Sequence, residues 1–328
     1  MICVRKFSVI TILVIASVVL TACGDALITE DIEPGPAPVV RPPSSPSRIG
    51  SALAPGSLSV ARSEHTTTVL PDGRVLVTGG VGSRDVELAS AELYDPDSGT
   101  WSNAASISQT RYRHTATLLP DGRVLIVGGK TSQSGIVAAE VYDPDSDTWN
   151  PANPMTTPRW SHTATLLSNG TVLVTGGQHL QEFHDSAEIF NPTSDSWITA
   201  GNMLIARSQH TASELPDGTV LVIGGNDGTG AQASSQVYDP RSQIWSDGPS
   251  MAEARWGHTS TTIPGGRILV IGGRQGSKSL KSVEVYDPAN GIWSQLASMN
   301  TARRSHTATM LTDGRILVAG GRGSLPVN

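Results

Sequence analysis

A unit of about 48 residues repeats along most of the chain, and this repeat limits the possible folds more than any other feature. Each unit opens on a histidine, namely His65, His114, His162, His210, His258 and His306. A diglycine follows in each unit, ending at Gly80, Gly129, Gly177, Gly225, Gly273 and Gly321. Five units are complete, and a sixth stops after its diglycine. Repeats of this kind predict one structural unit that is stacked against copies of itself.

Each unit predicts four short strands. In the second unit, His114–Leu119 and Val124–Val127 form the first two strands, and the intervening Pro-Asp-Gly is a hairpin turn. Ala139–Tyr142 predicts a third strand, and a fourth begins near Trp149 after an Asp-Pro turn. No unit has sustained helical periodicity. Four strands in about 48 residues predict one blade of a β-propeller.

The diglycine, a later aromatic residue and a tryptophan seven positions after it together resemble the kelch motif. The aromatic pairs are Tyr94 and Trp101, Tyr142 and Trp149, Phe190 and Trp197, Tyr238 and Trp245, and Tyr286 and Trp293. The resemblance extends over about residues 52 to 321. It implies an all-β kelch propeller, similar in architecture to the propeller of galactose oxidase, with six blades of four antiparallel strands. The whole chain is similar to bacterial kelch-repeat lipoproteins.

The sixth unit lacks its third and fourth strands, so closing the ring requires an N-terminal strand. Leu58–Arg62 aligns with Met299–Arg303, which predicts that the segment just before Arg62 supplies the fourth strand. Ala26–Thr29 is the available candidate for the third. The alternatives are an incomplete sixth blade or a chain shortened from a longer relative.

The N-terminus predicts export. Arg5 and Lys6 precede the apolar run Phe7–Leu20, and Leu20-Thr-Ala-Cys23 resembles the lipobox of bacterial lipoproteins. The expected division is a signal peptide over residues 1–22, a lipidated Cys23 with a proline-rich tether over 23–50, and the propeller over 51–328. The acylated cysteine would anchor the protein to a membrane. Because Asp does not directly follow Cys23, we expect the outer membrane or cell surface in a two-membrane bacterium. A plain signal peptide is the alternative.

Composition excludes several function classes. The net charge of −6 and the pI near 5.7 disfavour a nucleic-acid partner. Cys3 and Cys23 are the only cysteines, so the predicted propeller has no disulfide, no cysteine-based zinc site and no cysteine nucleophile. The copper and Cys–Tyr chemistry of galactose oxidase is excluded for the same reason.

An Arg-x-x-His motif occurs in every unit. Its members are Arg62 and His65, Arg111 and His114, Arg159 and His162, Arg207 and His210, Arg255 and His258, and Arg303 and His306. Catalytic groups differ in role, so six equal copies indicate a structural task, and we expect no catalytic residue among them. The expected arginine partners are Glu92, Glu140, Glu188 and Glu284; Gln236 breaks this set.

Strand direction places two kinds of connection on one face: the loops between the second and third strands, and the links from the fourth strand to the next unit. Nearly all of the sequence variation lies on this face. There the residue after the motif arginine includes Tyr112, Trp160, Trp256 and Arg304, which are candidate ligand-binding residues. Filling of gaps between blades is the alternative role for the aromatic residues. In the third unit, His179, Glu182 and His184 could bind a metal, although a polar loop without metal explains them too.

These patterns predict a lipid-anchored, non-catalytic binding module for an envelope protein or glycan, without a cofactor. The loops between the diglycine and the third strand have nearly constant length, so none is enlarged into a lid or pocket. The alternative is a carbohydrate-active enzyme similar to the sialic-acid-isomerising kelch enzymes, with acid–base groups on the same face.

Overall fold

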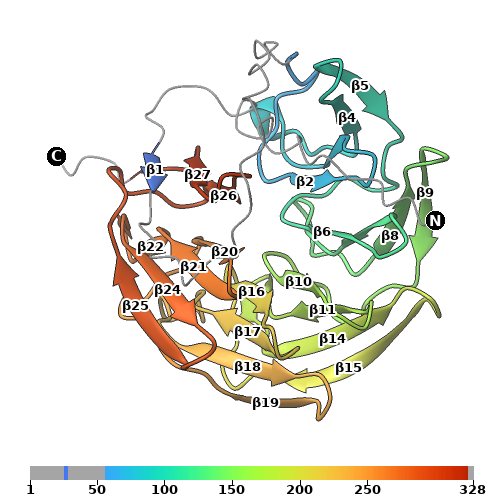
Figure 1. Ribbon diagram of the computed structural model, residues 1–328. Helices are drawn as coiled ribbons and strands as arrows, with labels where there is room; N and C mark the ends of the chain where they lie inside the picture. Colours follow the sequence, from blue (N-terminus) through green and yellow to red (C-terminus); the bar gives the residue numbers. More distant parts are fainter. Residues whose placement is uncertain (1–25, 29–55, 324–328) are drawn as a thin grey trace, which may run out of the picture.

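The structure, a computed structural model, describes residues 26–28 and 56–323. Five four-stranded antiparallel sheets and one three-stranded sheet are arranged around a central axis as the blades of a propeller (Figure 1). The predicted signal peptide, Cys23 and the tether apart from residues 26–28 lie outside the described residues. Within the described part, no helix is long and apolar enough to cross a membrane.

The strands of blades 1 to 5 pair in chain order from the axis outward, and we call the four positions a, b, c and d. The a strands are β2 (Thr66–Val69), β6 (Thr115–Leu118), β10 (Thr163–Leu166), β16 (Thr211–Glu214), β20 (Thr259–Ile263) and β26 (Thr307–Met310). The b strands are β3 (Val75–Thr78), β7 (Val124–Val127), β11 (Val172–Thr175), β17 (Val220–Ile223), β21 (Arg267–Ile271) and β27 (Ile316–Ala319).

The c strands of blades 1 to 5 are β4 (Ala91–Asp95), β8 (Ala139–Asp143), β14 (Ser186–Asn191), β18 (Ser235–Asp239) and β24 (Val283–Asp287). Their d strands are β5 (Thr100–Ala104), β9 (Thr148–Ala152), β15 (Ser196–Asn202), β19 (Ile244–Asp247) and β25 (Ile292–Leu296). Short b–c elements are the 3-10 turn Ser83–Asp85 and two hairpins, β12–β13 (Gln178–His179, Glu182–Phe183) and β22–β23 (Arg274–Gln275, Lys278–Ser279).

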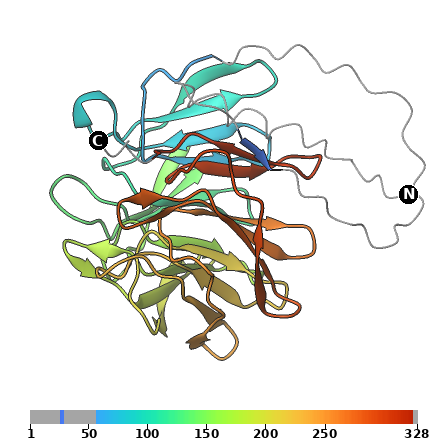
Figure 2. The ribbon, with the colours of Figure 1, turned by 90° about the vertical axis from the view of Figure 1, so that its left-hand side faces the viewer.

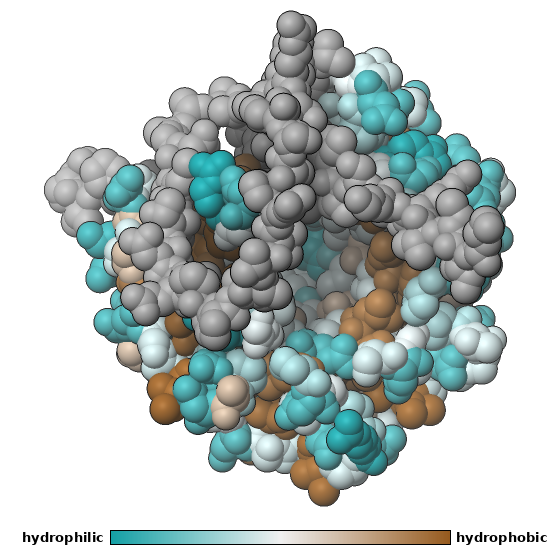
Figure 3. Space-filling view, in the orientation of Figure 1, coloured by the Kyte–Doolittle hydropathy of each residue, from teal (hydrophilic) through white to brown (hydrophobic). Residues whose placement is uncertain are grey.

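Burial follows the strand position. The b strands carry Val, Leu and Ile on both faces and are buried throughout in blades 1 to 4, because each lies between two neighbouring strands and two neighbouring blades. The a strands, rich in Thr and Ala, are half-buried around the axis. The space-filling view is hollowed at the centre of the ring (Figure 3).

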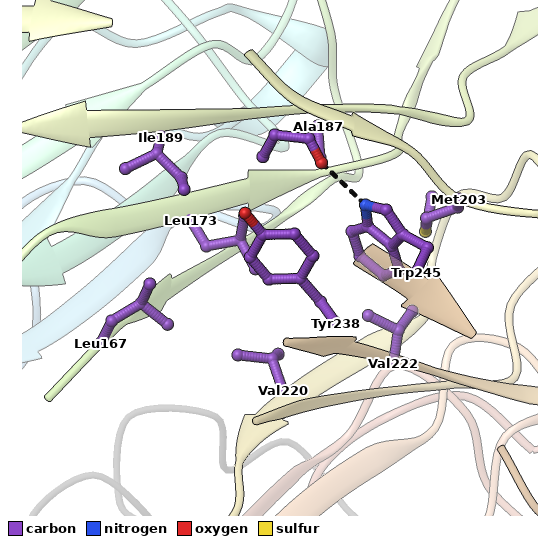
Figure 4. Close-up of a cluster of buried hydrophobic side chains, with 10 residues drawn as sticks. Leu167, Leu173, Ala187, Ile189, Met203, Val220, Val222, Tyr238 and Trp245 are labelled. Carbon is purple, nitrogen blue, oxygen red and sulfur yellow. Dashed lines mark hydrogen bonds between the residues drawn. The ribbon is translucent and has the colours of Figure 1, made fainter. Parts of the chain in front are cut away.

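The core consists of repeated clusters between adjacent blades. Figure 4 shows the cluster between blades 3 and 4, where Tyr238 and Trp245 lie with ring centroids 4.9 Å apart among aliphatic side chains of both blades. The indole Nε1 of Trp245 donates a hydrogen bond of 2.8 Å to the Ala200 carbonyl of blade 3. The kelch aromatic pair therefore packs two blades together and also bonds them.

Within the described residues, five blades are complete with four strands, where six complete blades were predicted, and the difference lies in the sixth blade. It contains β26, β27 and β1 (Ala26–Ile28), and β1 pairs antiparallel with β27, with Ala26 opposite Val318 (Figures 1 and 2). An N-terminal strand thus joins the last blade as predicted, in the c position. The sixth sheet as described has three strands, where four were predicted.

The segment expected to supply the fourth strand has another position. Leu58–Arg62 is not a strand; it forms the link that enters blade 1. Gly56 accepts a 2.7 Å hydrogen bond from the Trp101 indole, and the amide of Ser59 donates to Glu92. Links of other blades make the same contacts. Residues 51–55, which precede this link, lie outside the described residues.

Five junctions between blades share one set of backbone hydrogen bonds near the axis. The amides of Arg113, Ser161, Gln209, Gly257 and Ser305 each donate to the carbonyl of the equivalent residue one blade earlier, at 2.8 to 3.1 Å. This series runs from Glu64 in blade 1 to Ser305 in blade 6. Among residues 56–323, no such bond joins Ser305 back to Glu64. We call this junction between blades 6 and 1 the seam.

Candidate functional site

The motif arginines are buried and bind their own blades. In blade 3, the Arg159 guanidinium is fully buried and donates to the carbonyls of Gly176 and Ser186, at 2.7 and 2.9 Å. It also forms a 3.0 Å ion pair with Glu188, whose other oxygen accepts the amide of Thr156. This network ties strand b, strand c and the entering link together, which is a structural task. The same pair occurs in blades 1, 2 and 5.

Blade 4 keeps the arginine but lacks the acid. Arg207 is fully buried and donates to the Gly224 and Ser234 carbonyls, while Gln236 replaces the carboxylate. The Nε2 of Gln236 is buried without a hydrogen-bond partner. Burial lowers the pKa of Arg207 to about 10. This blade therefore holds a buried charge with weaker compensation than its neighbours.

The motif histidines form a belt between blades. The Nε2 atoms of His114, His162, His210, His258 and His306 lie 2.9 to 3.0 Å from the first threonine hydroxyl of the preceding blade. At the seam, the hydroxyl of Thr307 donates to the Ala319 carbonyl of its own blade.

Burial and a neighbouring arginine keep these imidazoles neutral. They lower the pKa of His162 and of His210 to about 3, and that of His65 and of His306 to about 4. A neutral imidazole in a repeated interblade contact is a structural group. The geometry therefore favours the structural interpretation of the Arg-x-x-His motif.

The diglycine is required by the close approach of the next blade. Gly128 has φ of 63°, and a Cβ there would lie 2.6 Å from the Arg159 carbonyl and 2.8 Å from the His162 ring. Gly129 has φ of 91°, and its amide donates to that same carbonyl. Only glycine satisfies both the backbone conformation and the contact.

Above the diglycines, six isolated antiparallel bridges surround the axis on the variable face, and we call them the bridge ring. Each joins the residue after the motif arginine to the residue after the diglycine. The pairs are Ser63–Val81, Tyr112–Lys130, Trp160–Gln178, Ser208–Asn226, Trp256–Arg274 and Arg304–Arg322. The repeated backbone thus presents six pairs of non-repeated side chains on one face, which makes this ring the candidate site.

One sector of the bridge ring is aromatic. The Lys130 ammonium lies 5.3 Å from the Tyr112 ring centroid and 4.7 Å from that of Trp160. The Trp160 ring also contacts the His179 ring edge-on at 5.8 Å. Trp160 is only 4% exposed, so it fills the space between blades, which was the alternative interpretation. Tyr112 is half-buried, and Lys130 occupies part of its face.

The opposite sector of the bridge ring is basic. The Arg274 guanidinium lies 4.4 Å from the Trp256 ring centroid. The guanidinium of Arg304 donates to the Ser279 hydroxyl at 3.2 Å. Partial burial and the charges of Arg274 and Arg322 lower the pKa of Arg304, so the three arginines share one electrostatic environment. We call Trp256, Arg274, Arg304 and Arg322 the basic corner.

Sequence reasoning selected one residue in four of the six bridges and missed its partner. Tyr112, Trp160, Trp256 and Arg304 lie on the ring as predicted from the order of the strands. The missed residues Lys130, Arg274 and Arg322 directly follow a diglycine. The position directly after the invariant diglycine varies from unit to unit, and this variation could have identified them.

The metal candidates of blade 3 do not converge. His179 and Glu182 face each other across the β12–β13 hairpin, and the His179 ring lies against Trp160. The Nε2 of His184 is 3.2 Å from the Pro158 carbonyl, to which it must donate. Among the described residues, no group of three or more His, Cys, Asp and Glu side chains is placed to hold a metal ion.

The opposite face carries a shallow depression of about 550 Å³. The a–b turns of blades 2 and 3 and the c–d turn of blade 3 form it, including Pro120, Asn169 and Pro192. Its walls are residues of the a–b and c–d turns, with Asn169 and Asn191 at positions where most blades have Asp.

Comparisons with known proteins agree with this architecture. Residues 59–157 match the β-propeller of tRNA wybutosine-synthesizing protein 4, and residues 159–204, 207–252 and 255–300 match the kelch motif. No curated protein sequence matches the chain. The solved structure of YjhT is similar, with a TM-score of 0.65, 15% identity, and coverage of 81% of this chain and 92% of that one. The likeness in structure at this identity concerns the fold alone; with the kelch matches it shows an all-β propeller that contains kelch repeats.

Proposed function

We propose that this protein is a non-catalytic binding module whose bridge ring contacts a glycan or a protein at the cell envelope. The observation that carries the proposal is the contrast between the scaffold and the ring. The blades repeat their core contacts, whereas no two of the six bridges consist of the same pair of residue types. Variation confined to one face of a rigid scaffold is typical of a recognition surface.

The chemistry of the ring supports ligand recognition. It combines aromatic rings with ordered cations, and none of its residues carries a carboxylate. Lys130 and Arg274 are held against aromatic rings, so little side-chain freedom remains for a ligand to remove. Aromatic residues and arginines are also the residue types enriched at binding hot spots.

A binding screen tests the proposal. Soluble protein beginning at Gly24, which lacks Cys23 but keeps β1, is presented to a panel of glycans and to solubilised envelope proteins, and bound material is measured. Trp256→Ala should reduce binding at least tenfold, because Trp256 positions Arg274 on the ring. Ile244→Ala, on the 61% exposed rim residue, is the matched control. A folded wild type that captures neither class of ligand would refute the proposal, and turnover of a bound sugar would favour the carbohydrate-active enzyme.

We further propose that Cys23 carries a lipid that anchors the propeller to a membrane through the proline-rich tether. The lipobox-like sequence before Cys23 supports this proposal. Cys23→Ser should move the protein from the membrane fraction to the soluble fraction, and mass spectrometry of the wild-type N-terminal peptide should detect acyl chains. A wild type without acyl chains would contradict the anchor but leave the binding proposal standing.

A further inference from the structure

Three arginines of the basic corner, Arg274, Arg304 and Arg322, lie together without an acidic partner. Arg304 and Arg322 are adjacent through their bridge, and the charges of Arg274 and Arg322 act on Arg304. Within residues 56–323, no ion pair joins any of the three to a carboxylate. Three like charges at one place repel one another, and on a chain with a net charge of −6 this is a local exception.

Many other arginines of the propeller do have acids. On the surface, ion pairs of 2.6 to 2.8 Å join Arg74 to Asp72, Arg113 to Glu64, Arg123 to Asp121 and Arg315 to Asp313. The buried motif arginines of blades 1, 2, 3 and 5 pair with glutamates. Arginines elsewhere in the propeller therefore have a carboxylate partner. The absence of a carboxylate partner at the basic corner points to an external anion.

Contacts within the protein hold the guanidinium groups of Arg274 and Arg304 in fixed positions. Arg274 stacks on Trp256 and donates to the Gly276 carbonyl, which fixes the direction of its guanidinium. Arg304 donates to the hydroxyl of Ser279, which is 1% exposed. Arg322 is exposed, and its backbone is paired with that of Arg304. Guanidinium groups fixed in this way can donate several parallel N–H bonds to one oxyanion.

We propose that the basic corner binds the anionic group of an acidic glycan, with Arg304 and Arg322 contacting the oxyanion and Trp256 with Arg274 flanking the sugar. Carboxylate and phosphate groups share the required chemistry, which is a planar or tetrahedral oxyanion with several acceptor oxygens. The inference rests on the proposed binding function and specifies the ligand class of the bridge ring.

The test compares three polysaccharides. Polygalacturonate carries carboxylates, its methyl ester has the same backbone without the charge, and a phosphomannan carries phosphate. Binding to each is measured by calorimetry at low and at physiological salt. We expect polygalacturonate or phosphomannan to bind, the methyl ester to bind at least tenfold more weakly, and affinity to fall as salt rises. Binding of the carboxylated or of the phosphorylated polymer identifies which anion the corner prefers.

Matched variants distinguish binding at the basic corner from general electrostatic attraction between the polymer and the protein surface. Arg304→Gln with Arg322→Gln should weaken binding of the acidic polymer at least tenfold, whereas Arg315→Gln, on the opposite face of the same blade, should not change it. Thermal unfolding confirms that each variant is folded. Equal loss in Arg315→Gln, or equal binding of the methyl ester, would overturn the inference. If only neutral glycans or proteins bind, and binding still depends on Trp256, the anion site is refuted while the proposed function stands.

Discussion

Acid should unfold the propeller through its histidine belt. Four motif histidines, His65, His162, His210 and His306, have pKa values of about 3 to 4 in the folded protein, against an ordinary value of 6.5. Below pH 6.5 the unfolded chain binds protons at these positions and the folded chain does not. Stability must therefore fall as the pH drops from 6.5 towards the folded pKa values.

The size of this loss of stability follows from the pH interval between 6.5 and 5. One pKa unit corresponds to about 1.4 kcal/mol, and an unfolded histidine is half protonated at pH 6.5, so each of these histidines lowers the free energy of unfolding by about 1.6 kcal/mol between pH 6.5 and 5. The four together remove roughly 6 kcal/mol, which is comparable to the whole stability of an ordinary domain of about 5–15 kcal/mol. Burial lowers the pKa values of His114 and His258 as well, which adds to the loss.

Urea unfolding followed by tryptophan fluorescence between pH 7.5 and 5 measures this dependence. The wild type should lose most of its stability over that range. His210→Gln keeps a hydrogen-bonding side chain next to Thr163 but does not titrate, so the pH dependence of its stability should be weaker, by an amount that approaches about 1.4 kcal/mol per pH unit near pH 5. Stability that is flat between pH 7 and 5, or an unchanged slope in His210→Gln, would refute the reasoning.

Further predictions concern the blade scaffold. Gln236→Glu should raise the free energy of unfolding by about 1–2 kcal/mol because it supplies the missing partner of Arg207, whereas Glu188→Gln should lower it by about 3 kcal/mol. Denaturant titration measures both, and a change of the same sign in the two variants would contradict the role of the ion pair. Gly128→Ala should destabilise by about 2–4 kcal/mol, since its Cβ would meet the Arg159 carbonyl in a left-handed conformation; a neutral effect in the same titration would exclude that contact. Amide hydrogen exchange should be faster in β26 and β2 at the seam than in β10 between two complete blades, and equal protection would show that the ring is closed.

Much of the fold could be predicted from local pattern. The Asp-Gly turns, the apolar b strands and the regular spacing of Trp149 and its equivalents each depend on residues close in sequence, and the strands occur where these residues place them. The roles of the motif arginines were predictable for a related reason, since a buried arginine needs a carboxylate and Glu188 recurs in step with Arg159.

The candidate site was only partly predictable. Strand order places Tyr112 and Trp256 on the variable face, but their exposure depends on neighbours that lie far apart in sequence. Lys130 and Arg274 cover the two rings from across the bridge, and Trp160 is buried against His179. Because such contacts depend on side-chain packing, periodicity carries no information about them.

The repeating unit, its four strands, the interblade tryptophans and the variable face all follow from spacing along the chain, so local sequence is enough to predict them. Which residues contact each other across the propeller depends on the folded structure. It placed Ala26–Ile28 beside β27 and brought Arg274 to Arg304 and Arg322. At the seam between blades 6 and 1, it left the part of the chain that is described without the backbone bond of the other five junctions. These contacts join residues from different blades or from opposite ends of the chain, and closure of the propeller is the physical event that brings them together.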